Sequence, residues 1–139
     1  MPKYAYVTDK DVSDACKELG LSDWSGRKDI EVTEAEARIL RDVVGGETLD
    51  LPLDEFRQAL EVELEHGLAF DDANVTCNHP VLTGLIVLAH LKEGTDYYRR
   101  LTVMELEMER DAAEKAGNTE RAAKKAKALE AARAALDTG

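Results

Sequence analysis

Two histidines and several carboxylates stand at spacings that could bring them into one site. Glu63 and His66 are three residues apart, and helical di-metal carboxylate proteins present their ligands at this one-turn spacing. His90 is the only ionisable residue in the apolar run from Pro80 to Leu91. Two imidazoles combined with two carboxylates suit zinc, iron or manganese.

The helical positions of these residues aim them at a shared interior. Between Leu53 and Leu64 the apolar residues form one stripe, in which Glu63 projects inward and His66 sits at the edge. A carboxylate in such a stripe is costly unless it is paired or bound to a metal. We therefore predict a buried Glu/His cluster that binds a divalent transition metal, with Glu63 or Glu105 as the base if the metal assists catalysis. The predicted ligands are Glu63, His66, His90, Glu93 and Glu105.

The same residues also fit a purely structural role. A single buried histidine is usually hydrogen-bonded to a carboxylate, and Glu63 with His90 would form such a pair. The Glu-x-x-His spacing also arises by chance in a chain with 29 acidic residues. Whether the protein is an enzyme stays open, because no nucleophile elbow, phosphate loop or Ser/His/Asp arrangement is present.

Two further motifs give weaker signals. Cys77 and His79 could begin a zinc site, but no second pair with ligand spacing accompanies them. Asn74-Val75-Thr76 matches a glycosylation acceptor, but the simpler interpretation is that it shapes a turn.

The helices that would position these residues are marked by capping and stop signals. Capping boxes at Thr8 and Thr33 open two helices, and glycines close them. Gly67 is expected to stop the third helix after His66, and Thr95 to cap the fifth. The predicted helices span residues 9–19, 34–44, 52–66, 80–93, 96–115 and 119–136. Only residues 4–7 resemble a strand.

The predicted fold is all-α, a compact helical bundle around a central buried helix at about 80–93. This helix is apolar on every side, which requires protein all around it. We expect one helical domain over residues 1–117, followed by an Ala/Lys-rich helix over 118–139. The Ala-rich segment 119–137 has a net charge of +2 and little apolar area, so it needs a partner surface on the acidic body or on a second chain.

The composition excludes several classes of protein. There are 18 Lys and Arg residues against 29 Asp and Glu, so the net charge of −11 argues against nucleic acid or an anionic membrane as the main partner. Two cysteines cannot build a multi-bridge secreted scaffold. No signal peptide is visible, and the apolar run is too short to span a bilayer. We expect a soluble, cytoplasmic protein.

Four ordered motifs resemble a known family. They are Val62-Glu63-Leu64-Glu65-His66-Gly67, Asn74-Val75-Thr76, Leu88-Ala89-His90-Leu91 with Glu93, and Asp96-Tyr97-Tyr98 followed by Met104-Glu105. Together they resemble a small family of unknown function that occurs in bacteria and tailed phages, over about residues 54–110. The resemblance implies a helical domain without an established activity, and it supports one site shared by the five predicted ligands.

The phage occurrence in that family raises a second class of function. The chain would then be a non-enzymatic structural or interaction protein, oligomeric and located in a virion. Its partner would be another protein or a second copy of itself.

Overall fold

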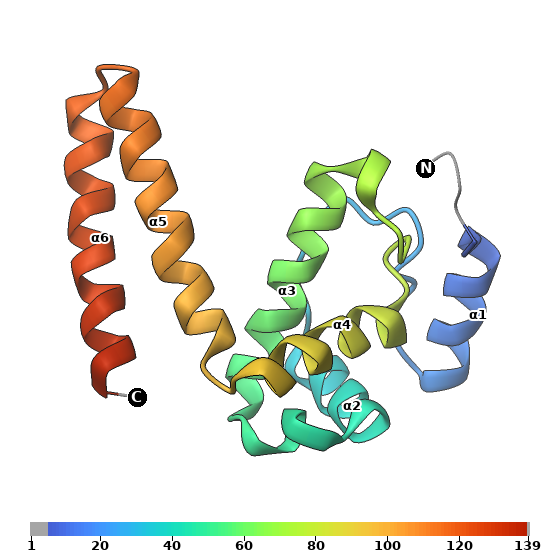
Figure 1. Ribbon diagram of the computed structural model, residues 1–139. Coiled ribbons are helices and arrows are strands. Elements are labelled where there is room, and N and C mark those ends of the chain that lie inside the picture. Colours follow the sequence, from blue (N-terminus) through green and yellow to red (C-terminus); the bar gives the residue numbers. More distant parts are fainter. Residues whose placement is uncertain (1–5, 139) are drawn as a thin grey trace. The chain divides into compact units, whose positions relative to one another are not determined.

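The computed structural model describes residues 6–138 of the 139-residue chain (Figure 1). In this range all regular elements are helical, which confirms the all-α prediction. Tyr6 and Val7 are not in a strand, and the rest of the strand predicted at 4–7 lies outside the described residues. The elements are α1 (Asp9–Leu19), α2 (Glu34–Val44), η1 (Gly46–Asp50), α3 (Leu53–Ala69), η2 (Asp71–Ala73), α4 (Pro80–Glu93), α5 (Tyr97–Lys115) and α6 (Thr119–Thr138).

The chain divides into two units, Met1–Glu93 and Gly94–Gly139. Unit 1 contains α1 to α4, and unit 2 contains α5 and α6. Unit 1 holds 20 of the 29 acidic and nine of the 18 basic residues, so the whole net charge of −11 belongs to it. From the sequence we predicted a single domain over residues 1–117, which would group α5 with the preceding helices. That grouping stays a prediction.

The first two helices begin as their sequences predict. The Thr8 hydroxyl accepts from the Asp11 backbone N–H, and the Asp11 carboxylate accepts from the Thr8 N–H in return. Thr33 and Glu36 form the same reciprocal pair at the start of α2. Each box satisfies two backbone donors that a helix start leaves without partners.

Helix α4 is the centre of unit 1, where it packs against α1, α2, α3 and η1. Its buried face contains Gly84, where a Cβ would lie 2.8 Å from Cγ2 of Val44, so glycine lets α2 approach closely. The central position is therefore confirmed. The prediction that protein surrounds this helix on every side is wrong, because Leu85 is 43% exposed and Leu88 is only half-buried.

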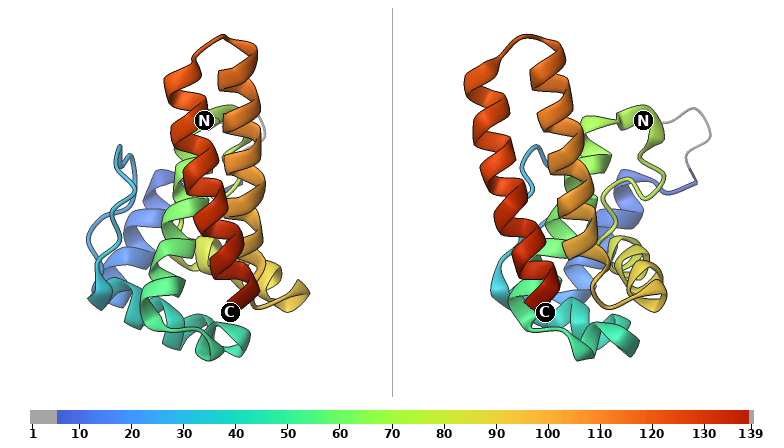
Figure 2. Two further views of the ribbon diagram at one scale, coloured as in Figure 1. Left: turned by 90° about the vertical axis from the view of Figure 1, so that its left-hand side faces the viewer. Right: turned by 60° about the vertical axis from the view of Figure 1, so that its left-hand side comes forward.

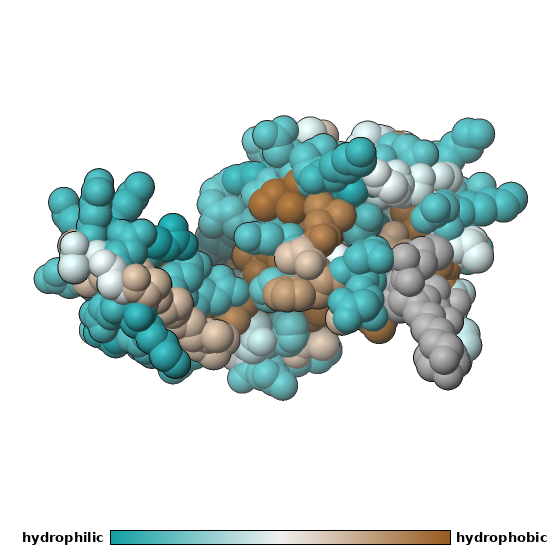
Figure 3. Space-filling model, turned by 90° about the horizontal axis from the view of Figure 1, so that it is seen from above, coloured by the Kyte–Doolittle hydropathy of each residue, from teal (hydrophilic) through white to brown (hydrophobic). Residues whose placement is uncertain are grey.

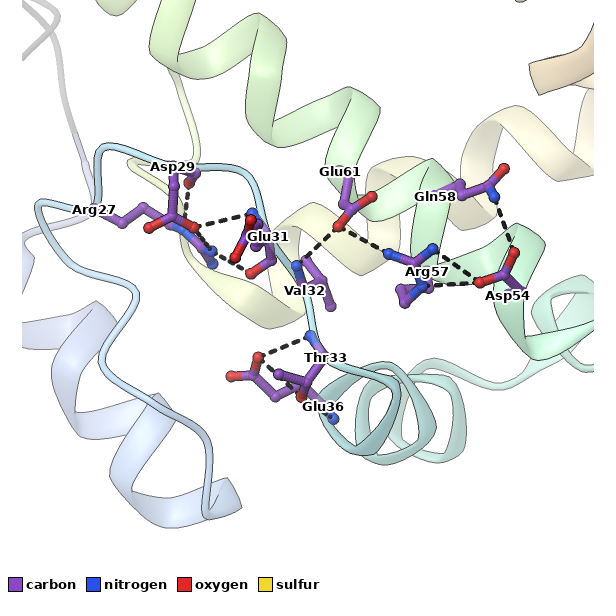
Figure 4. Close-up of polar contacts among 10 residues, drawn as sticks. All are labelled: Arg27, Asp29, Glu31, Val32, Thr33, Glu36, Asp54, Arg57, Gln58 and Glu61. Carbon is purple, nitrogen blue, oxygen red and sulfur yellow. Dashed lines mark hydrogen bonds and ion pairs between the residues drawn. The ribbon is translucent and has the colours of Figure 1, made fainter.

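The segment between α1 and α2 is held by buried polar contacts. Trp24 is fully buried and donates from Nε1 to the Glu36 carboxylate at 3.0 Å. Farther along, the Val32 N–H donates to Glu61 of α3 at 3.0 Å, and Arg57 binds the same carboxylate (Figure 4). Glu61 thereby fixes an irregular segment to α3 by a backbone hydrogen bond.

Helix α3 runs past its predicted stop. We expected it to end at His66 with Gly67 as a cap, but it continues to Ala69. A Cβ at Gly67 would lie 2.9 Å from Cγ of Asn74, so the glycine allows the Asn74 side chain to approach α3 closely.

Unit 2 is a hairpin of two helices that lie side by side in antiparallel directions (Figures 1 and 2). Leu129 of α6 is buried, and Lys125 and Arg133 pair with Glu109 and Glu107 of α5. The Ala-rich helix thus finds its partner surface within the chain. The predicted Thr95 cap is wrong, because Asp96 is the N-cap of α5, without a side-chain capping hydrogen bond.

Candidate functional site

Glu63 and His90 form a pair that links α3 to α4. Oε1 of Glu63 lies 3.3 Å from Nδ1 of His90, and the exposed fractions of the two side chains are 11% and 30%. The inward aim of Glu63 follows from its place in the buried stripe that Phe56, Leu60 and Leu64 complete. This is the carboxylate–histidine pair expected under the structural interpretation of the motif.

A cleft of about 190 Å³ lies beside this pair. Glu63 and His66 line it from α3, and Thr83 and Ile86 line it from α4. Residues of segment 70–76 also line it, among them Phe70 and Val75, which are 60% and 70% exposed. The cleft therefore combines a nearly buried carboxylate, an imidazole and an apolar rim.

Three of the five predicted ligands are connected through Glu63. Glu63 and His66 share the cleft, and His90 contacts Glu63. Glu93 is exposed at the end of α4, and Glu105 belongs to unit 2. Among residues 6–138 no group of three or more His, Cys, Asp or Glu side chains is arranged to hold a metal ion.

The turn between η2 and α4 is organised by Asn74. Its side-chain Nδ2 donates to Oδ1 of Asn78 at 2.9 Å, and both residues are buried. Cys77 and Asn78 have φ angles of 51° and 68°, a conformation that is uncommon for residues other than glycine. The Asn-Val-Thr motif therefore shapes a turn, as its simpler interpretation predicted.

His79 caps α4 through its side chain. Its Nδ1 accepts from the backbone N–H groups of Val81 and Leu82 at 3.2 and 3.3 Å. Burial lowers the pKa of the His79 imidazole, and the Asp11 carboxylate opposes that shift. Burial likewise raises the pKa of the Cys77 thiol.

The face of unit 1 that Figure 3 shows carries a patch of apolar side chains surrounded by hydrophilic ones. The end of α3 and η2 reach this side of the unit, since both lie uppermost in Figure 1. Phe70 follows α3 directly and is one of the large exposed apolar residues. An apolar patch of this kind is a common mark of an interaction site.

One polar residue of functional interest, Arg27, was not predicted from the sequence. Its side chain is only 9% exposed, and its guanidinium donates to the backbone oxygens of Asp29 and Glu31 (Figure 4). No periodic signal could reveal it, because it lies in an irregular segment whose course is set by tertiary contacts.

Comparisons with known proteins locate the chain in a family but give it no activity. No curated protein and no solved structure matches it. None of the helices within residues 6–138 combines the length and the hydropathy needed to cross a membrane. A family model covers residues 12–107, which includes the paired residues, the cleft and most of the range that carries the sequence resemblance. The chain therefore belongs to the family described as "Protein of unknown function (DUF5661)".

Proposed function

We propose that this protein acts by binding another protein, from which it receives one basic side chain in the cleft beside Glu63 and His66. The observation that carries the proposal is the composition of the cleft wall. A carboxylate with only 11% of its side chain exposed stands beside two apolar side chains that are more than half exposed.

The size of the cleft suits one side chain. Cofactor and drug-sized ligands occupy pockets of roughly 300–1,000 Å³, whereas this cleft measures about 190 Å³. A lysine or arginine chain would pack its methylene groups against the apolar wall and direct its charge to Glu63.

The charge of unit 1 favours the same kind of partner. Its net charge of −11 attracts basic surfaces and accelerates their encounter at low ionic strength. Phe70 and Val75 supply the apolar area that would be removed from water, at about 25 cal/mol per Å². As part of this proposal, we place the protein in the cytoplasm, or in a virion.

A displayed library of random peptides tests the proposal with the full-length protein as bait. We expect enrichment of peptides with one Lys or Arg flanked by apolar residues. Glu63→Gln and Phe70→Ser should abolish the enrichment, whereas Glu65→Gln, an exposed carboxylate on the same helix, should leave it intact. Enrichment of acidic peptides, no enrichment, or equal effects of Glu63→Gln and Glu65→Gln would contradict it.

Self-association is the form of this proposal in which the partner is a second copy. In this case the molecular mass measured by light scattering should rise with protein concentration. The Phe70→Ser variant should have the mass of a monomer at every concentration. A monomeric mass at every concentration excludes this form.

A divalent transition metal is the second candidate ligand. It is favoured by the one-turn spacing of Glu63 and His66, which line the same cleft. Zinc, iron or manganese would require further ligands, for which His90, Glu93 and Glu105 stay candidates. Elemental analysis of protein purified without a metal-affinity tag should find one metal per chain, and His66→Asn should lose it. Substoichiometric metal together with a Tm that a chelator does not change would exclude this candidate.

A further inference from the structure

A second cavity of unit 1, of about 320 Å³, plays no part in the proposed function. Asn74 contributes to its wall and to that of the cleft beside Glu63, so the turn at 74–78 takes part in both. Arg27 and Lys28 also line this second cavity. This cavity falls within the size range of pockets that hold small molecules.

Arg27 is the most constrained polar group of this cavity. Its Nε and Nη2 donate to Asp29 and Glu31 at 2.6 to 3.0 Å, and its guanidinium carbon lies 4.8 Å from the centre of the Trp24 ring. Nη1 is buried and has no hydrogen-bond partner among the described residues. A buried donor without a partner is unfavourable, so a ligand acceptor that reaches Nη1 would relieve a penalty that the folded chain carries.

The charges of the wall have both signs. Arg27 and Lys28 are cationic, whereas Asp9 and Asp71 are anionic. A phosphate or another polyanion would be repelled by the two carboxylates, and a plain amine by the two cations. A ligand that carries one negative and one positive group matches both kinds of charge.

The rest of the wall limits the size and polarity of such a ligand. Leu68 and Cys77 are apolar, and the paired amides of Asn74 and Asn78 supply neutral polar atoms. The cavity therefore suits a compact molecule with one group of each charge and a short apolar side chain. We propose that this pocket binds a free α-amino acid, with its carboxylate toward Arg27 and Lys28 and its ammonium group toward Asp71 and Asp9.

Saturation-transfer NMR on the full-length protein tests this proposal with leucine as the probe. Two analogues test the two charged groups separately, since N-acetylleucine lacks the ammonium group and leucinamide lacks the carboxylate. We expect saturation transfer to leucine and a loss of most of it for both analogues. No transfer to leucine, or equal transfer to either analogue, would overturn the proposal.

Adjacent carboxylates offer a matched pair of variants. Asp71 lines the cavity and Asp72 does not, although both are exposed residues of η2. Asp71→Asn should raise the Kd for leucine about fivefold, a loss of about 1 kcal/mol, and Asp72→Asn should leave it unchanged. Lys28→Ala should weaken binding similarly and, as an exposed residue, tests the cationic side without the loop rearrangement that a change at Arg27 risks. Equal Kd values for Asp71→Asn and Asp72→Asn would contradict the assignment.

Discussion

Gly67 of α3 lies directly against the side chain of Asn74. A Cβ at Gly67 would stand 2.9 Å from both Cγ and Oδ1 of Asn74, closer than carbon and oxygen atoms approach without displacement. Asn74 in turn holds Asn78 and contributes to the walls of both cavities. The absence of a side chain at one helical position therefore allows the turn that separates the two proposed sites.

Replacing Gly67 with alanine should destabilise the protein despite the better helix propensity of alanine. The added methyl group forces Asn74 away, and overpacking of this kind costs about 1–3 kcal/mol. Urea denaturation measures the effect. In an Asn74→Ala background the obstacle is gone, so Gly67→Ala should become stabilising by up to about 1 kcal/mol. The same sign in both backgrounds would show that the contact does not limit position 67.

The cap of α4 should depend on pH because an imidazole supplies it. His79 can accept from Val81 and Leu82 only while Nδ1 is unprotonated, and burial lowers its pKa in the folded protein. As the pH falls, the unfolded chain therefore takes up this proton at a higher pH than the folded protein does. The contribution of the cap to the free energy of unfolding is complete above about pH 6.5 and is lost as the pH falls through the pKa of the folded state.

The variant His79→Asn isolates this effect, because asparagine is a good N-cap that does not titrate in this range. The stability of the wild type relative to His79→Asn should decrease as the pH falls below about 6.5. His79→Ala should cost about 1 kcal/mol at neutral pH. A difference between wild type and His79→Asn that stays constant across this range would contradict the capping role.

Glu36 should matter for stability far more than a typical acidic residue. Burial alone would raise the pKa of its carboxyl, but hydrogen bonds from Trp24 and Ser22 outweigh it and the pKa is lowered. Both carboxylate oxygens accept from donors, and the amide group of a Gln can replace only one of them. Glu36→Gln should cost about 1–3 kcal/mol in urea denaturation. Glu34→Gln, at an exposed site of the same helix, should change stability by less than about 0.5 kcal/mol.

The Ala-rich helix should depend on one leucine for its docking. Leu129 is 1% exposed, whereas Leu136 of the same helix is only half-buried. Leu129→Ala should destabilise unit 2 by about 2–4 kcal/mol, seen as early loss of helical circular dichroism on heating. Leu136→Ala should have a smaller effect. Equal effects would mean that α6 does not dock through its buried face.

Local signals were sufficient where one segment sets its own structure. The capping pairs at Thr8 and Thr33 act within three residues, so the starts of α1 and α2 could be predicted. Gly67 was wrongly predicted to end α3, because its role is set by the contact with Asn74, and only the tertiary fold brings that residue near. The His79 cap was missed because imidazole is not among the usual N-cap groups.

The candidate site was predicted in part. Helical periodicity placed Glu63 inward. A pair of Glu63 with His90 was the alternative to a metal site, and the structure contains that pair. Periodicity carries no information about segments outside helices, so it could not indicate the rim residues Phe70 and Val75 or the buried Arg27. It also could not indicate that Glu105 belongs to another unit.

If the proposed function is right, the cleft beside Glu63 receives a basic side chain. Amide chemical-shift mapping of the full-length protein tests it most directly, with the capped tripeptide Leu-Lys-Leu as probe and Leu-Gln-Leu as the neutral control. We expect saturable shifts at Glu63, His66, Phe70 and Val75 with the lysine peptide. These shifts should be absent with the glutamine peptide and absent in Glu63→Gln. Shifts that are the same for both peptides, or that fall outside the cleft, would contradict it.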